Sequence, residues 1–157
     1  ELNSMGAGVW GSVFFALFAL MIIISRPLVG KVYARYGSRF VIYPGVGLFI
    51  VGLAILGVVS TPVGIICTAP LLGLGYGAAQ PAFQALAVQS APIERAGVST
   101  ATYFLALDIA VGAGSVILAL IANALGYQHL YQITAIVMII ALALYHFVIR
   151  KHSYIAE

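Results

Sequence analysis

The sequence predicts an all-α integral membrane protein with about five transmembrane helices. Hydrophobic residues make up 63% of the 157 residues and charged residues only 7%, whereas a soluble domain carries roughly a quarter of its residues as charged side chains. Apolar segments recur along the chain and approach the ~20 residues that a helix needs to cross about 30 Å of hydrocarbon. These runs are continuous rather than alternating, which favours helices over the strands of a β-barrel.

A single transmembrane bundle is expected over residues 1–157. Its spans are expected at 6–28, 40–59, 63–88, 98–125 and 131–149. Clusters of charged and turn-forming residues separate the spans, at 26–39, 60–62, 91–95 and 126–129.

The distribution of basic residues predicts the orientation. Five alternating spans place the first and third junctions on the same side as the C-terminus. All seven basic residues fall on that side: Arg26, Lys31, Arg35, Arg39, Arg95, Arg150 and Lys151. The positive-inside rule makes this side cytoplasmic. We therefore expect a multi-pass protein of the cell membrane, with its N-terminus outside and its C-terminus in the cytoplasm. The net charge of +3 then reflects topology and contact with anionic lipid, so no nucleic-acid partner is predicted.

Asp108 is the one acidic residue inside any expected span. An acid within the membrane is costly and is by default a candidate functional residue. Gly112 and Ser115 follow it on the same helical face, which is mostly small or polar and suits helix packing or a wet cavity. Asp108 is either a proton or cation coupling site or a protonated carboxyl that packs between helices. Ser115 is assigned to the cavity and Gly112 to packing.

A second polar stripe lies on the third span. Gly73, Tyr76, Gly77, Gln80 and Gln84 share one face at helical spacing. Gln80 is expected near the depth of Asp108, so the two could meet across a cavity lined also by Tyr76 and Gln84. The other interpretation is interhelical hydrogen bonding, with Gly73 and Gly77 permitting close backbone approach.

The sequence contains no catalytic constellation. The single acid within the spans has no histidine near it, and neither a nucleophile–base pair nor a set of metal ligands is present. We therefore predict a protein that is not an enzyme and that needs no metal or cofactor.

The first junction reads RPLVGKVYARYGSR over residues 26–39. It resembles the Gly-x-Leu-Ala-Asp-Arg-x-Gly-Arg-Lys loop of the major facilitator superfamily, in the degenerate form of the C-terminal half. Gly30, Val32, Arg35, Gly37 and Arg39 carry the match. Ala34 stands where the motif has its Asp, so this loop lacks the carboxylate of the charge pair attributed to the motif.

A second resemblance covers most of the remaining chain. The stretch GLGYGAAQP over residues 73–81, residues 95–97 and residues 103–114 are similar to the tenth and eleventh helices of bacterial drug and metabolite exporters of this superfamily. The resemblance implies helices eight to twelve of a twelve-helix transporter, hence a partial six-helix half whose N-terminal partner half is missing. A half of this kind consists of two inverted three-helix repeats.

These observations predict a fragment of a secondary transporter. It would move small, partly hydrophobic molecules by alternating access, as a proton-coupled antiporter that works in efflux. The alternative is an accessory membrane subunit that packs against a partner chain, in which case Asp108 would meet a fixed basic residue of that chain.

Overall fold

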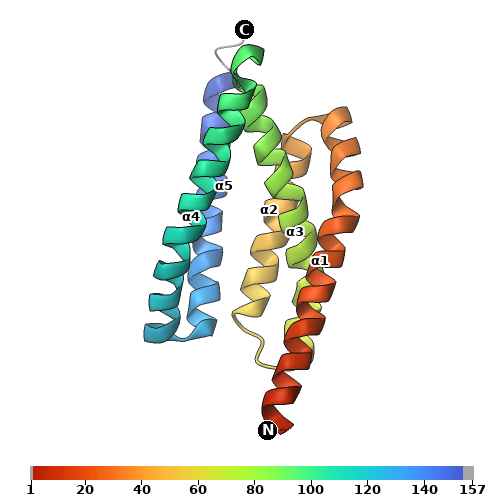
Figure 1. Ribbon diagram of the computed structural model, residues 1–157, viewed down its shortest axis with the longest axis vertical. Coiled ribbons are helices and arrows are strands. Elements are labelled where there is room, and N and C mark those ends of the chain that lie inside the picture. The colour runs from red at the N-terminus through yellow and green to blue at the C-terminus, as the bar shows by residue number, and fades with distance from the viewer. Residues whose placement is uncertain (1, 154–157) are drawn as a thin grey trace.

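A computed structural model describes residues 2–153 of the chain, and its side chains from residue 8 to residue 147. Five α-helices follow one another in this part: α1 (Leu2–Tyr36), α2 (Arg39–Leu56), α3 (Pro62–Gln89), α4 (Ala96–Leu125) and α5 (Tyr127–Ser153), with the 3-10 turn η1 (Ile93–Arg95) between α3 and α4. Successive helices run in opposite directions (Figure 1). Each contains a segment long and apolar enough to cross a membrane. The predicted all-α membrane fold with five helices is therefore confirmed.

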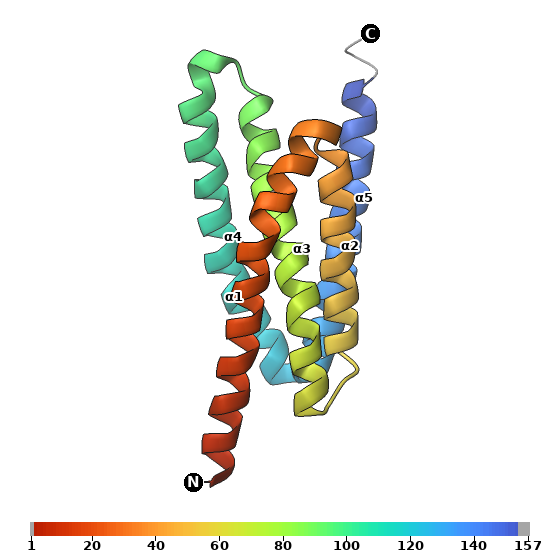
Figure 2. The same ribbon diagram turned by 90° about the vertical axis from the view of Figure 1, so that its right-hand side faces the viewer.

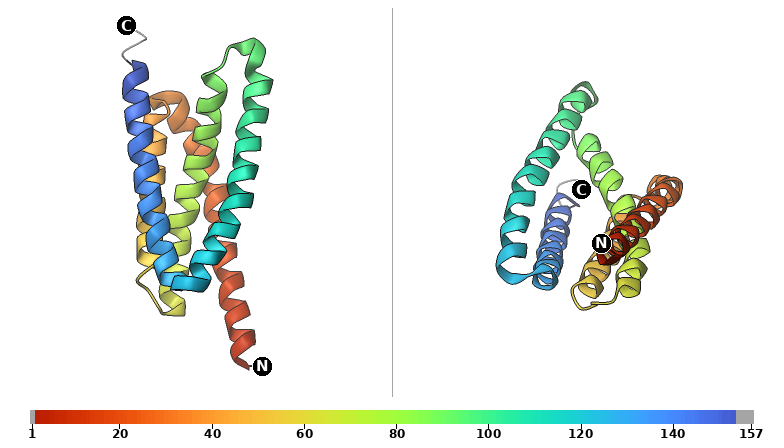
Figure 3. Two further views of the ribbon diagram at one scale, coloured as in Figure 1. Left: turned by 90° about the vertical axis from the view of Figure 1, so that its left-hand side faces the viewer. Right: turned by 60° about the horizontal axis from the view of Figure 1, so that its bottom comes forward.

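Helix α3 lies at the centre of the bundle. It packs along both α1 and α2, while α5 lies against α2 and α4 touches α3 and α5. Figure 3 shows α4 and α5 as a pair beside the group formed by α1, α2 and α3. Two buried clusters hold the centre, one around Ile42, Val46 and Ala82 and the other around Leu53, Leu72 and Ala135. Helix α4 has no buried residue, so most of its surface, apart from the sides that touch α3 and α5, is open to lipid or to further protein.

Glycines on α3 permit the close approach of α1. A Cβ atom added at Gly73 would lie 2.6 Å from the main-chain oxygen of Phe18, and one added at Gly77 would collide with the Ser25 hydroxyl. Ser25 is itself buried and donates a hydrogen bond to the main-chain oxygen of Ile22, at 2.8 Å. The two helices therefore meet almost backbone to backbone, as small residues allow in membrane proteins.

A third glycine of α3 faces α2 instead. A Cβ atom at Gly75 would lie 2.7 Å from the main-chain oxygen of Gly45 and 2.7 Å from the main-chain nitrogen of Phe49. Gly45 is the reciprocal position, because a Cβ there would meet the side chain of Ala78 at 3.0 Å. Glycines thus bring α3 close to two neighbouring helices at once, and they replace the large side chains that would fill a soluble core.

Local chain chemistry sets the ends of the helices. Gly37 and Gly126 both have a φ of +84°, a left-handed conformation that glycine adopts without strain and that ends a helix. Their N–H groups donate to the main-chain oxygens of Tyr33 and Ala122, both at 2.9 Å. At the start of α3, the Thr61 hydroxyl accepts a hydrogen bond from the main-chain N–H of Gly64.

The first junction is shorter than the sequence suggested. Helix α1 runs to Tyr36, well beyond the expected end at Leu28, so the whole stretch before Gly37 is helical. Proline does not end the helix at Pro27; instead, α1 bends in its last turns (Figure 2), as expected where a proline removes one backbone hydrogen bond.

The basic residues gather at one end of the bundle. Arg35 lies in the last turn of α1, Arg39 begins α2, and Arg95 lies in η1. We call this the basic end; the last turns of α5 also lie there (Figure 1). Two further predicted members of the basic side, Arg150 and Lys151, have side chains outside the described residues.

Candidate functional site

A polar cavity of about 610 Å³ lies between α1, α3 and α4. Helices α1 and α3 provide nearly all of its lining and α4 provides one residue. The polar lining residues are Arg26, Tyr33, Gln80 and Gln84, and the rest are Val29, Gly30, Ala34, Pro81, Ala82, Ala85 and Phe104. Ligand pockets typically have roughly 300–1,000 Å³ and combine an apolar wall with a few polar groups. We refer to this site as the polar cavity.

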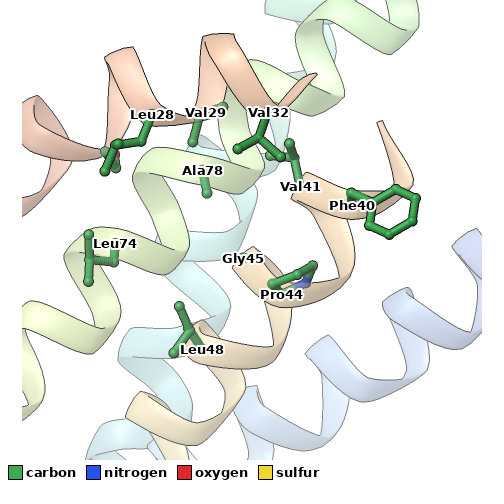
Figure 4. A pocket seen from close by; sticks show the side chains of 11 residues that line it. Leu28, Val29, Val32, Phe40, Val41, Pro44, Gly45, Leu48, Leu74 and Ala78 are labelled. Carbon is green, nitrogen blue, oxygen red and sulfur yellow. The ribbon is translucent and has the colours of Figure 1, made fainter. Parts of the chain in front are cut away.

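A smaller crevice between α1, α2 and α3 offers a contrast. It has about 190 Å³ and is lined almost entirely by aliphatic groups such as Leu28, Leu48 and Leu74 (Figure 4). Its single hydroxyl, from Ser25, is already bonded to its own helix. The crevice has the character of a packing space, and the polar cavity is therefore the candidate site.

The two glutamines of the third span come together in the polar cavity. Gln80 and Gln84 are one helical turn apart on α3 and are both half-buried. Within the described part of the chain, neither side-chain amide takes part in a hydrogen bond. Gln80 lies nine residues before the end of α3 at Gln89, about 14 Å along the axis, which places the cavity within the membrane-spanning part of the bundle.

Asp108 does not line the polar cavity. It is exposed on α4, and within residues 8–147 its carboxylate has neither a hydrogen-bond nor an ion-pair partner. Phe104 does line the cavity, and Asp108 follows it by one helical turn on nearly the same face. Asp108 lies twelve residues into α4 from Ala96, about 18 Å along the axis, and so slightly further from the basic end than Gln80.

The structure places Tyr76 and Ser115 elsewhere. The ring of Tyr76 lies between Phe18 of α1 and Phe49 of α2, with ring centroids 6.1 Å and 6.3 Å away. The Ser115 hydroxyl donates to the main-chain oxygen of Gly112 at 2.8 Å and is exposed. Neither residue lines the polar cavity. A Cβ at Gly112 would meet no atom within 4 Å, so the face of α4 on which Gly112 lies is open at this point among the described residues.

Two hydrogen bonds connect α4 to α3 near the polar cavity. The Tyr103 hydroxyl donates to the main-chain oxygen of Gln80 at 3.2 Å, and the Ser99 hydroxyl donates to the main-chain oxygen of Ala87 at 2.7 Å. Both join the halves of α3 and α4 that are nearer the basic end. Another bond, from the Tyr33 hydroxyl to the Gln89 side-chain oxygen at 3.1 Å, connects α1 to α3 there.

The loop motif forms the end of α1 and the start of α2. Gly37 supplies the left-handed turn between them, and the Arg35 guanidinium lies 5.4 Å from the centre of the Tyr36 ring. Arg39 is exposed at the first position of α2. Gly30 lies inside α1 and lines the polar cavity, so the motif spans both the cavity and the junction.

Two polar lining residues, Arg26 and Tyr33, are not among the predicted site residues. By sequence, Arg26 belongs to the basic junction, because cations near the end of a span are counted with the loop. In the structure it lies ten residues before the end of α1 at Tyr36, about 15 Å along the axis. A usable signal was present: a helical stripe runs through Arg26, Gly30 and Tyr33.

Comparisons with known proteins identify the family. The profile of the Major Facilitator Superfamily matches residues 2–155. The chain is also similar to an uncharacterized MFS-type transporter of Methanocaldococcus jannaschii, with 27% identity over 123 residues that cover 77% of this chain and 31% of the relative. The chain thus spans about a third of the length of this relative. No solved structure matches it significantly. Because the profile covers almost the entire sequence, the chain belongs to the major facilitator superfamily.

Proposed function

We propose that this chain is the C-terminal part, helices eight to twelve, of a secondary transporter that exports small, partly hydrophobic molecules in exchange for protons. The polar cavity is the observation that carries this proposal. It combines two glutamine amides with an apolar wall in the membrane-spanning part of the bundle, where transporters of this kind bind substrate. An N-terminal half, as in a chain of the relative's length, supplies the other wall of the cavity.

In this proposal, alternating access rocks the present bundle against that N-terminal half. Gln80 and Gln84 provide polar contacts to the substrate. Asp108 is the proton site, because it is the one acid inside the expected spans and its exposed carboxylate has no partner among the described residues. The turn at Gly37 joins α1 to α2 and acts as the cytoplasmic hinge, together with Arg35 and Arg39.

A transport measurement tests the proposal. Cells that express the full-length protein are expected to accumulate less of a small hydrophobic probe, such as 2-naphthoate, than cells that lack it. A protonophore should abolish the difference because it collapses the proton gradient. Equal accumulation in both strains, or a difference that survives the protonophore, would count against proton-coupled efflux.

The proposed orientation places the basic end in the cytoplasm. Ser90 and Ser60 are exposed side chains near opposite ends of α3. In the full-length protein freed of native cysteines, a membrane-impermeant maleimide applied to intact cells should label Ser60→Cys. Ser90→Cys should be labelled only after the membrane is opened. The reverse pattern would invert the topology.

A further inference from the structure

We infer that the polar cavity selects an anionic group carried on an apolar body, and that Arg26 is the residue that recognises it. This inference rests on the proposed function and assigns the class of substrate. The ligand that fits is a carboxylate, or a group of similar charge, attached to an aromatic or aliphatic skeleton.

The first argument is the charge of the lining. Arg26 is the only residue with a full charge among those that line the polar cavity, and no carboxylate lines it. Within residues 8–147, no Asp or Glu lies at ion-pair distance from Arg26. A cation inside a membrane span is costly unless it is paired or hydrated. An anionic ligand provides the missing partner, whereas a cationic ligand would be repelled.

The second argument is the direction in which the Arg26 side chain leaves its helix. Long basic side chains near the ends of membrane helices often extend toward the headgroups, which would remove Arg26 from the cavity. Each Cα–Cβ bond in a helix tilts toward the N-terminus, and α1 ends at the basic end. The Arg26 side chain therefore leaves the backbone away from that end. Lys31 and Arg35 lie about 8 Å and 14 Å nearer to it along the axis and are better placed to meet headgroups.

The third argument is that the cavity combines hydrogen-bond donors with an apolar wall. A guanidinium donates two parallel hydrogen bonds to one carboxylate, and the side-chain amides of Gln80 and Gln84 have N–H donors that no described residue occupies. On the other lining positions, Val29, Pro81 and Phe104 provide an apolar wall. The cavity thus offers donors for an anion beside a surface for a hydrophobic body.

Binding of three matched probes tests the inference directly. The probes 2-naphthoate, 2-naphthamide and 2-(aminomethyl)naphthalene share one aromatic body and differ in charge. Equilibrium dialysis with the full-length protein in phosphatidylcholine nanodiscs, corrected with empty nanodiscs, should show about ten-fold or more tighter binding of the acid than of the amide, the gain expected from a charge-assisted pair. The amine should bind most weakly. Equal binding of all three probes would overturn the inference without any mutation.

Variants assign this selectivity to Arg26. Arg26→Gln should lower the affinity for the acid about ten-fold and leave the amide unchanged, which a general loss of structure would not do. Arg26→Lys should retain part of the preference because it keeps the charge but loses the paired geometry. Lys31→Gln removes one charge from the same helix outside the cavity and should change nothing. An acid preference that persists in Arg26→Gln would overturn the role of Arg26.

Two further comparisons are needed. One distinguishes a free solute from a lipid headgroup as the source of the anion, and the other distinguishes failure of this inference from failure of the proposed function. If the acid binds equally well in phosphatidylglycerol and phosphatidylcholine nanodiscs, the ligand is a free solute. If phosphatidylglycerol weakens binding of the acid to the protein with Arg26 but not to Arg26→Gln, the ligand is an anionic lipid headgroup. Binding is measured at equilibrium without a gradient. Selective binding without transport therefore contradicts only the proposed function, and transport without acid selectivity contradicts only this inference.

Discussion

Replacing Asp108 by Asn is expected to abolish proton-driven transport by the full-length protein, down to the level of protein-free vesicles. Asn is nearly isosteric with Asp but cannot release or take up a proton. The carboxylate has no partner within the described residues, so the substitution breaks no contact there. Substrate flux driven by a pH gradient across proteoliposomes is the measurement, made with a probe that the cell assay shows to be exported.

Substrate exchange provides the decisive companion measurement. Exchange of labelled for unlabelled substrate at equal pH moves no net protons, so Asp108→Asn should retain it while pH-driven flux disappears. Asp108→Glu keeps a titratable acid and should preserve part of the coupling. Glu94→Gln, a neutralised acid in the exposed turn η1, is the control. Undiminished pH-driven flux in Asp108→Asn would show that the proton site lies elsewhere.

Replacing Gly75 by Val is expected to destabilise the protein by roughly 1–3 kcal/mol, the usual cost of overfilling a packed interface. The atoms that a Cβ would meet at 2.7 Å belong to the backbone of α2, at Gly45 and Phe49. A side chain can rotate away from such a contact, but backbone atoms cannot, so α2 and α3 must separate. Thermal unfolding of the full-length protein in detergent measures the loss.

The matched control for this experiment is Gly47→Val on α2. A Cβ at Gly47 would meet no atom within 4 Å, and the substitution carries the same change in intrinsic helix propensity. The difference between the two variants therefore reports packing alone. Similar unfolding temperatures for Gly75→Val and Gly47→Val would mean that α2 and α3 are not in close contact at this point.

The helices themselves could be predicted from the sequence because the bilayer imposes their length. Continuous apolar runs and a few turn residues were enough for five spans. The first junction was harder, because the cations between Arg26 and Arg39 look like a loop although α1 continues to Tyr36. Only Gly37, with its left-handed backbone, ends that helix, and glycines are too common in this chain for one to be recognised in advance.

The candidate site was predictable only in part. Helical spacing put Gln80 and Gln84 on one face of α3, and the structure brings both into one cavity. The same periodicity included Tyr76, which instead lies against Phe18 and Phe49. A stripe on one helix does not specify which neighbour covers each part of it. That information depends on the approach of α1 and α2, and therefore on glycine contacts that act between helices.

The hydrogen bond from Tyr103 to Gln80 attaches α4 to α3 without using the side chain that lines the cavity. The acceptor is the main-chain oxygen of Gln80, which every amino acid possesses, while the side chain at the same position lines the cavity. Ser99 likewise bonds to the main chain of Ala87. Substitutions at position 80 can therefore alter ligand preference while the attachment of α4 persists. A lineage of such proteins could acquire new specificities at this residue without first having to rebuild the scaffold.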